Sequence, residues 1–204
     1  MSGQIFVITG PSGVGKSTII SRLRKKIPGV GYSVSHTSRK PRKNEADGVN
    51  YHFVDRAAFE KMIGDKAFVE WAKVYEDLYG TSFSSLRSQT DQDLDLVMDL
   101  DSQGAKNIKK TFQDSVLIYI LPPSLQELEK RLRGRASDEE AEIEARLEKA
   151  RKEIENCVDY DHIIFNENLD KTLEEVASII LSERSRRSRR LPLVEKNFKI
   201  SFSS

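Results

Sequence analysis

The sequence is poor in cysteine, since Cys157 is the only one among 204 residues. A single cysteine cannot form an internal disulfide, so the fold does not depend on an oxidising compartment. No apolar run approaches the roughly 18 residues of a transmembrane helix. The first residues also lack the charged lead and small-residue cleavage site of a signal peptide. We therefore expect a soluble protein of the cytoplasm.

The sequence also lacks an excess of charge of one sign. It contains 33 Lys and Arg against 32 Asp and Glu, for a formal net charge of +1. No overall field draws the chain to nucleic acid or to a membrane, so any site for a polyanion has to be local. With 38% hydrophobic and 32% charged residues, the composition is that of a polar globular protein.

Short continuous apolar runs alternate with helical patterns along most of the chain. Such runs suit strands that are buried on both faces. Their alternation with helices favours an α/β fold in which a parallel sheet carries helices on both faces. The expected strands are residues 5–9, 94–100, 116–121 and 162–165, and the expected helices start at Lys16 or span roughly 102–112, 124–133 and 170–184.

Three segments depart from this alternation. Residues 32–92 hold many aromatic side chains and short strand-like runs, which predicts a small mixed insert with Trp71 in its core. Residues 131–149 are dense in Arg and Glu, which predicts a solvated, weakly packed helical hairpin. Five arginines lie within residues 184–190. A solvated tail is the simplest interpretation of that last segment, and a nucleic-acid contact or an ordered arm are the alternatives.

The most specific motif follows the first expected strand and matches G-x-x-x-x-G-K-[ST], a phosphate-binding loop. Its glycines let successive backbone N–H groups turn toward phosphate oxygens, and the helix that follows adds its positive N-terminal end. Lys16 can reach the β- and γ-phosphates, and the Ser17 hydroxyl can hold Mg²⁺. The motif consists of Gly10, Pro11, Ser12, Gly13, Val14, Gly15, Lys16 and Ser17.

This loop identifies a donor site but not the class of enzyme. A GTPase would read guanine with an Asn-Lys-x-Asp stretch, and no asparagine here is followed by lysine. The Asp101-Ser102-Gln103-Gly104 stretch resembles a GTPase D-x-x-G but stands alone. A motor ATPase would normally be larger. A kinase for a small nucleotide needs a second anion site that faces the first.

Residues 33–54 supply a candidate for that second site. Ser35, Arg39 and Arg42 are polar donors close together, and two arginines suit bidentate capture of a phosphate monoester. Tyr51 can add a hydroxyl. A solvated basic turn and an RNA-binding patch are the alternatives, and the acidic residues that follow, Glu45 and Asp47, weaken the second of these.

With these residues in view, the chain resembles the guanylate kinase family over about residues 4–182. The resemblance depends on GPSGVGKST, on S-x-x-x-R-x-P-R from Ser35 to Arg42 with Glu45 and Tyr51 after it, on FVEWA at 68–72, on YGT at 79–81, on MDLDSQG at 98–104, on LPPS at 121–124, and on the arginines within 130–135 and 145–150.

The resemblance implies a P-loop α/β fold of three layers with a mixed GMP-binding insert and a helical lid. It implies the Mg²⁺-dependent transfer of a phosphoryl group from ATP to GMP or dGMP, in purine nucleotide metabolism. It also implies no membrane or specific nucleic-acid partner, and a monomer or small homo-oligomer. The expected parts are core at 1–31, 94–128 and 150–184, GMP-binding insert at 32–93, lid at 129–149 and basic tail at 185–204.

The resemblance also implies roles for single residues. On the GMP side, the phosphate clamp is Ser35, Arg39, Arg42, Tyr51 and Tyr79, the guanine readers are Glu70 and Thr81, and Asp99 and Asp101 lie beside the acceptor. On the ATP side, the loop residues 10–17 are joined by Thr18, Arg131, Arg135 and Asn166, of which Asn166 contacts the adenine side. The catalytic cations are Lys16, Arg39, Arg135 and Arg146, and the metal ligand is Ser17.

Physical chemistry agrees with these roles. A carboxylate at Glu70 accepts from guanine N1–H and N2–H₂, whereas adenine presents a bare N1, and such a site can reject the wrong base by roughly 10⁴-fold. Phosphoryl transfer requires positive charge and in-line placement more than covalent chemistry.

Simpler interpretations stay open. Glu70 could be an exposed strand residue, and Asp99 could cap the next helix. The whole chain could be a protein-binding scaffold or a kinase for another nucleotide.

Overall fold

The computed structural model describes residues 3–202 with the exception of 32, 44, 75 and 135–139. A central sheet of five parallel strands carries the core. Its order is β2 (Val30–Gly31), β7 (Asp95–Asp99), β1 (Ile5–Thr9), β8 (Val116–Leu121) and β9 (His162–Phe165). The α/β prediction is confirmed, and the four strands expected from apolar runs are all present.

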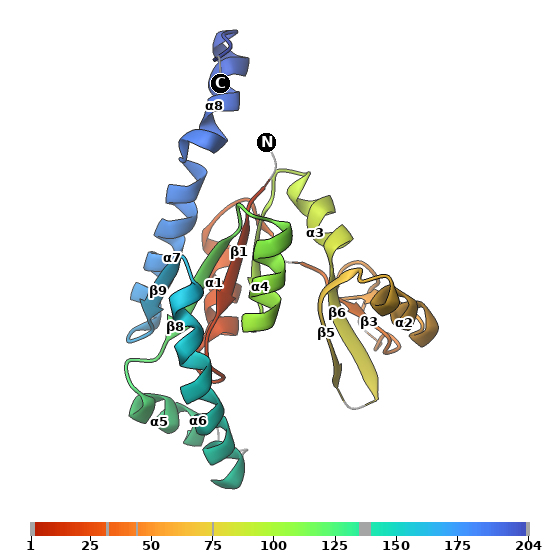
Figure 1. The fold of residues 1–204 in the computed structure, drawn as a ribbon, viewed down its shortest axis with the longest axis vertical. Helices are drawn as coiled ribbons and strands as arrows, with labels where there is room; N and C mark the ends of the chain where they lie inside the picture. The colour runs from red at the N-terminus through yellow and green to blue at the C-terminus, as the bar shows by residue number, and fades with distance from the viewer. Residues whose placement is uncertain (1–2, 32, 44, 75, 135–139, 203–204) are drawn as a thin grey trace.

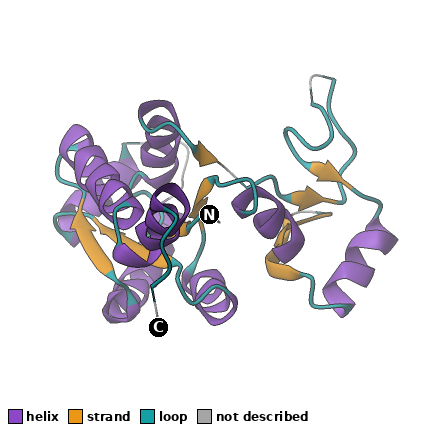
Figure 2. Cartoon of the chain, turned by 90° about the horizontal axis from the view of Figure 1, so that it is seen from above, coloured by secondary structure: helices purple, strands orange, loops and turns teal. Residues whose placement is uncertain are grey.

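Helices cover both faces of this sheet, so the core has three layers (Figure 2). Alternate residues of β1 point to opposite faces, as the pleat of a strand requires. Phe6 and Ile8 pack with helices α1 (Lys16–Lys26) and α7 (Leu169–Arg184). Ile5 and Val7 pack with α3 (Phe83–Thr90) and α4 (Ser102–Thr111). Burial on both faces explains why these strands read as continuous apolar runs.

A second, mixed sheet forms the insert beside the core (Figure 1). Its order is β4 (His52–Phe53), β3 (His36–Thr37), β6 (Asp77–Ser82) and β5 (Phe68–Val74). Helix α2 (Arg56–Gly64) packs on it through Phe59, which contacts Phe68 and Leu78. The side-chain amide of Asn107 in α4 donates to the Val69 carbonyl at 2.7 Å, which attaches the insert to the core.

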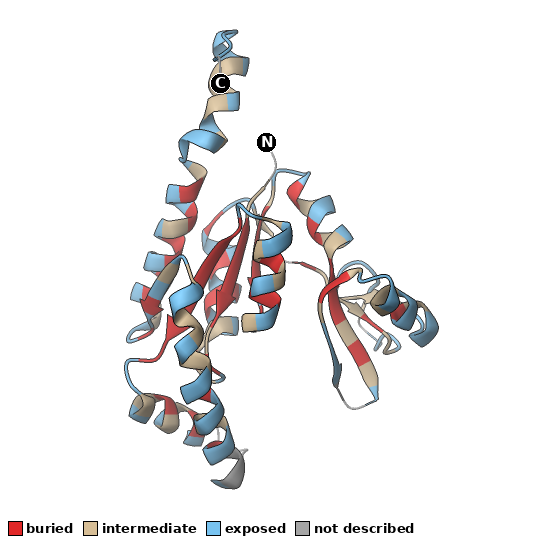
Figure 3. Ribbon diagram, viewed as in Figure 1, coloured by how far each residue is buried: buried red, intermediate tan, exposed pale blue. Residues whose placement is uncertain are grey.

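Trp71 is not a core residue, so that expectation is wrong. Its side chain is 48% exposed on the edge strand β5. It borders a cavity that faces α4 and lies outside the apolar cluster that α2 forms with the sheet. The strand pattern predicts an apolar residue at this position but not which face of the sheet α2 covers. The outer part of β5 is coloured as exposed in Figure 3.

The charged hairpin is formed by α5 (Leu125–Arg133) and α6 (Glu140–Ile154), followed by the short 3-10 helix η1 (Glu155–Asp159). It is better packed than its composition predicts. Leu128 and Leu132 of α5 are buried against Ile143 and Ala150 of α6. Its charges pair along the surface, as between Arg133 and Glu129 at 2.9 Å.

The basic tail forms a helix, α8 (Arg187–Phe198), that has no buried residue, so it is an ordered arm that stays largely solvated. Its attachment point is Asp95, a carboxylate only 2% exposed at the start of β7. It accepts from Arg184 Nε at 2.7 Å, from Arg189 at 2.9 Å and from the Gln4 backbone N–H at 2.8 Å. A buried charge needs such partners.

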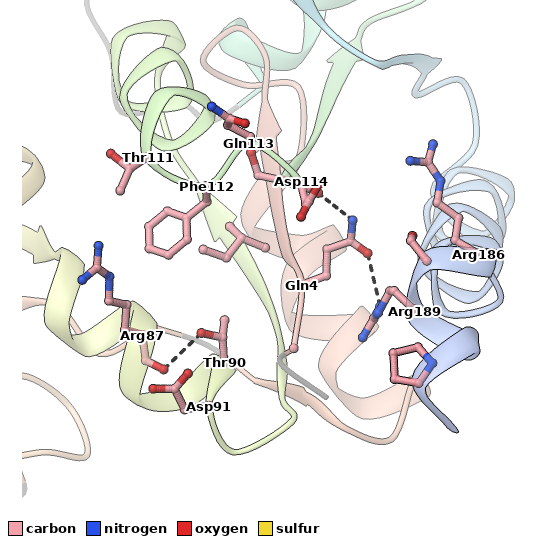
Figure 4. Close-up of a pocket in the computed structure, with 15 residues that line it drawn as sticks. Gln4, Arg87, Thr90, Asp91, Thr111, Phe112, Gln113, Asp114, Arg186 and Arg189 are labelled. Carbon is pink, nitrogen blue, oxygen red and sulfur yellow. Dashed lines mark hydrogen bonds between the residues drawn. The ribbon is translucent and has the colours of Figure 1, made fainter. Parts of the chain in front are cut away.

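Beyond this contact α8 projects from the core and buries none of its residues (Figure 1). A cavity of about 600 Å³ lies between α8, α3 and the turn before β8. Gln4 lines this cavity, and its side-chain oxygen accepts from Arg189 at 3.2 Å (Figure 4).

Among the described residues, no helix is both long enough and apolar enough to cross a lipid bilayer.

We predict that Asp95→Ala lowers the free energy of unfolding by about 3 kcal/mol, because it leaves two partly buried guanidinium groups without their carboxylate. Urea denaturation at neutral pH measures this. The matched control is Asp159→Ala, which breaks an exposed pair with Lys106 at 3.2 Å. An exposed pair contributes at most about 1 kcal/mol. Equal losses for the two variants would show that Asp95 is not an anchor.

Candidate active site

The loop between β1 and α1 is the candidate donor site. Gly13 and Gly15 have φ of 91° and 105°, in the left-handed region that favours glycine. At Gly10 a Cβ would lie 2.2 Å from the Ile120 carbonyl oxygen of β8, and at Gly13 it would lie 2.8 Å from Leu132 of α5. Only glycine therefore fits, and the loop curls tightly between the sheet and the hairpin.

Side chains along the loop differ in burial. Pro11 and Val14 are buried, which holds the loop on the core. Ser12, Ser17 and Thr18 are exposed. Their hydroxyls are therefore accessible to a nucleotide or a metal ion.

Lys16 bends back across the loop and is only 17% exposed. Its Nζ donates to the Gly10 carbonyl at 2.7 Å and lies 3.8 Å from Asp99 Oδ1 at the end of β7. Burial raises the pKa of the Asp99 carboxyl, and the Lys16 ammonium opposes that shift. Asp99 therefore lies beside the loop lysine and does not cap α4, while its expected place beside the acceptor stays a prediction.

A cavity of about 370 Å³ adjoins the loop and brings together many of the residues expected to bind ATP. Asn166, which directly follows β9, is 5% exposed there. Its side-chain amide is hydrogen-bonded to Val14 and Thr172, so it supports the loop from behind. The expected residues that line the cavity are Gly13, Val14, Gly15, Thr18, Arg131 and Asn166.

The three arginines expected to act from the lid, Arg131, Arg135 and Arg146, differ in how the structure describes them. Arg131 on α5 donates to the Asn166 carbonyl at 2.9 Å and pairs with Glu127 at 3.1 Å, so it is fixed at this cavity. Arg146 lies half-buried on α6. Arg135 lies outside the described residues.

A second cavity, of about 240 Å³, lies in the insert. It gathers four of the residues expected to bind GMP, together with Asn50, which the sequence did not single out. The lining consists of Ser35, Asn50, Tyr51, Glu70, Tyr79 and Gly80.

A hydrogen-bonded chain runs along the base of this cavity. Glu70 and Thr81 are cross-strand neighbours on β5 and β6, and Thr81 Oγ1 donates to Glu70 Oε1 at 2.7 Å. Ser35 Oγ lies 3.2 Å from Thr81 Oγ1. Burial raises the pKa of Glu70, the Thr81 hydrogen bond lowers it, and the charge of Asp101 raises it further. Glu70 is thus a partly buried acceptor and not an exposed strand residue.

Arg39 lies beside this cavity, in contact with two tyrosines that line it. Its guanidinium donates to Glu45 at 2.8 Å and to the Tyr79 hydroxyl at 3.3 Å. These bonds, with that of Glu45 first, raise the pKa of Arg39 above its ordinary value. The guanidinium carbon also lies 5.7 Å from the centre of the Tyr51 ring. Arg39 is therefore held in one orientation, with Tyr51 and Tyr79 beside it.

Arg42 and Asp101 complete the expected set. Arg42 is exposed, and within the described part of the chain its guanidinium has no hydrogen bond or ion pair. Its backbone N–H donates to Glu45 at 2.8 Å. Asp101 caps α4 by accepting from the Gly104 N–H at 2.8 Å. It also borders a cavity of about 360 Å³ that Glu70 shares.

The two groups of residues are separate in space (Figure 1). Among the described residues, no hydrogen bond or ion pair joins residues 10–18 of the loop to the insert at 33–82. The insert and the core meet at α4 instead.

The structure adds residues that the sequence interpretation did not assign. Glu45 orients the Arg39 guanidinium and the backbone at Arg42. Its position three residues after Arg42, in a polar turn, is the sequence feature that could have predicted this role. Thr172 holds the amide of Asn166 from inside α7 at 3.0 Å. A buried threonine in a helix gives no such signal.

Comparison with known proteins assigns the family. The family model for guanylate kinase matches residues 2–183. The guanylate kinase of Syntrophotalea carbinolica is 45% identical over 188 residues, which cover 92% of this chain and 90% of that protein. The guanylate kinase of Clostridioides difficile is 42% identical over 197 residues, which cover 97% and 96%.

A solved structure agrees with these sequences. The crystal structure of guanylate kinase from Anaplasma phagocytophilum superposes with a TM-score of 0.69 at 30% identity, over 98% of each chain. The similarity therefore includes the core, the insert and the hairpin. This chain belongs to the guanylate kinase family.

Proposed function

We propose that this chain transfers the γ-phosphoryl group of ATP to GMP and releases ADP and GDP. One observation carries the proposal: the same polypeptide holds two distinct groups of polar side chains. The first is the phosphate loop with Lys16, and the second is the hydrogen-bonded pair of Glu70 and Thr81 beside Arg39. The first suits the phosphates of a triphosphate donor and the second suits guanine and a monophosphate. Membership of the family supports both assignments.

On the donor side, the loop residues 10–15 and the N-terminal end of α1 would bind the triphosphate through backbone N–H groups. Lys16 would leave the Gly10 carbonyl and contact the β- and γ-phosphates. Arg131 lines the same cavity and adds positive charge near the phosphates. Thr18 and Asn166 border it on the nucleoside side.

The residues at the loop fit a magnesium ion held mainly by substrate. Among the described residues there is no cluster of three or more His, Cys, Asp or Glu that could form a metal cage. Mg²⁺ commonly uses one or two protein oxygens, substrate phosphates and water. The exposed Ser17 hydroxyl would hold it. When bound, the ion neutralises charge on the β- and γ-phosphate oxygens.

On the acceptor side, Glu70 would accept the N1–H and N2–H₂ of guanine, with Thr81 and Ser35 fixing the carboxylate. Arg39, Arg42 and the hydroxyls of Tyr51 and Tyr79 would hold the phosphate. Adenine would face Glu70 with a bare N1 and lose these bonds. Asp101 lies close enough to influence the Glu70 charge and so belongs to the guanine end.

In the transfer, an oxygen of the GMP phosphate attacks the γ-phosphorus in line. A new phosphorus–oxygen bond forms as the bond from that phosphorus to the β–γ bridging oxygen breaks, and ADP leaves with that oxygen. Lys16 and Arg39 would stabilise the negative charge on the oxygens of the phosphoryl group during its transfer. The family resemblance adds Arg135 and Arg146. Closure of the insert and hairpin would exclude water and so prevent hydrolysis of ATP.

ATP and GMP are metabolites of the cell interior, and a chain with one cysteine needs no oxidising compartment. We place the activity in the cytoplasm for these reasons.

The direct test is a coupled assay of ADP release from ATP and Mg²⁺ with GMP, dGMP, AMP, CMP or UMP as acceptor. We expect turnover with GMP and dGMP, and rates with AMP lower by about 10⁴-fold because adenine cannot donate to Glu70. Equal rates with GMP and AMP would contradict the acceptor assignment. Nucleotide binding without any turnover would favour a scaffold.

The same assay has a matched pair of variants. Lys16→Ala should lower kcat with GMP by at least about 100-fold, since it removes a cation from the reacting phosphates. Lys25→Ala removes an exposed lysine from the other end of the same helix and should leave kcat unchanged. Full activity of Lys16→Ala would contradict the role of the loop.

Binding of GMP should depend on pH through Glu70. Because burial raises its pKa, Glu70 takes up a proton at a higher pH than an ordinary glutamate does as the solution is acidified. A protonated carboxyl cannot accept both guanine donors, so KM for GMP should rise as pH falls. Initial rates between about pH 5 and about pH 8 measure this.

The phosphate of GMP also titrates in this range, so the control is a variant. In Glu70→Gln the KM for GMP should be raised at every pH, and the part of the pH dependence due to Glu70 should vanish. Glu60→Gln, an exposed glutamate on α2 paired with Arg56 at 2.8 Å, should keep the wild-type profile. Identical profiles for wild type and Glu70→Gln would remove Glu70 from guanine binding.

A further inference from the structure

A buried hydrogen-bond chain links helix α7 to the phosphate loop. Thr172, in α7, is 1% exposed, and its hydroxyl donates to Asn166 Oδ1 at 3.0 Å. The Asn166 amide nitrogen in turn donates to the Val14 carbonyl at 2.7 Å. The chain therefore runs from α7 through the end of β9 into the middle of the loop.

Asn166 is held on every side. Its backbone N–H donates to the Leu121 carbonyl at 2.7 Å, and its carbonyl accepts from Arg131 at 2.9 Å. A Cβ added at Gly15 would lie 3.0 Å from the Asn166 amide nitrogen, so the loop backbone packs directly on this side chain. One residue thus meets the loop, the sheet, α7 and the hairpin.

The two ends of the Asn166 amide have complementary partners. The Val14 carbonyl can only accept, so it requires the amide nitrogen on the loop side, and the Thr172 hydroxyl then donates to Oδ1 at the other end. Without that donor, Oδ1 would be buried with no partner, which costs free energy and loosens the orientation. The Val14–Gly15 peptide directly precedes Lys16, so its position sets that of the lysine.

We infer that Thr172 is a positioning residue for the donor nucleotide: through Asn166 it fixes Val14 and Gly15 in the conformation that binds ATP. It touches no substrate itself. The inference rests on the proposed function, because it assumes that the loop holds the phosphates of ATP. The acceptor cavity in the insert shares none of these contacts, so the effect is confined to the donor.

The test compares binding of ATP with Mg²⁺ by calorimetry, and KM for GMP, in Thr172→Val and Thr172→Ser. Valine keeps the shape of threonine and removes the hydroxyl, whereas serine keeps it. We expect Thr172→Val to weaken ATP binding about three- to tenfold, the range of one hydrogen bond. KM for GMP should not change, and Thr172→Ser should bind ATP as the wild type does.

The matched control is Thr90→Val. Thr90 is 6% exposed, and its hydroxyl donates to the Leu86 carbonyl at 3.2 Å in α3, away from the loop. It should lose thermal stability as Thr172→Val does, with ATP binding unchanged. If Thr172→Val does not fold, Thr172→Ala serves instead. Alanine also removes the hydroxyl that donates to Asn166, so it should weaken ATP binding in the same way.

Equal ATP binding by wild type and Thr172→Val would overturn the inference, as would equal weakening of ATP and GMP or a failure of serine to rescue. A wild-type chain that binds ATP but does not phosphorylate GMP would contradict the proposed function alone. The two failures are therefore distinguishable.

Discussion

The proposed donor site depends on the parallel pairing of β1 with β7 on one side and β8 on the other. This register sets Ile8 beside Asp99, and Thr9 beside Tyr119. The chain can then leave β1 at Gly10 only by turning against the Ile120 carbonyl, which admits no side chain. Lys16 returns across that turn to Gly10 and Asp99. The central position of one buried strand thus determines where the loop, its lysine and the nearby carboxylate lie.

The proposed acceptor site depends on a different constraint, the partial burial of the Glu70 carboxylate in a small sheet. Glu70 keeps its acceptor oxygens oriented because Thr81 stands opposite it in the β5–β6 register and Ser35 follows. Arg39 is oriented in the same way by Glu45 and Tyr79. Preorganised groups of this kind bind a ligand without first losing their own freedom. These local pairs, rather than contacts with the loop, hold the side chains of the insert cavity in place.

The sequence predicts what local periodicity and motif spacing control. Strands buried on both faces and the glycines of the loop have patterns of their own, so β1, β8, β9 and the loop match their predicted positions. Contacts between distant segments have no such pattern. The packing of Trp71, the partner of Arg189 and the amide orientation of Asn166 depend on which surfaces meet after folding. Asp95 looks like any strand residue until Arg184 and Arg189 are placed beside it.

The central claim is that one chain carries a phosphoryl group from one of these sites to the other. Phosphorus NMR of a mixture of ATP, GMP and Mg²⁺ with a catalytic amount of the protein tests it most directly, because the spectrum follows the transferred phosphoryl group itself. We predict that the γ-phosphate signal of ATP is replaced by a β-phosphate signal of GDP, with ADP formed in equal amount. Release of the γ-phosphate as inorganic phosphate, or an unchanged ATP spectrum in the presence of GMP, would contradict it.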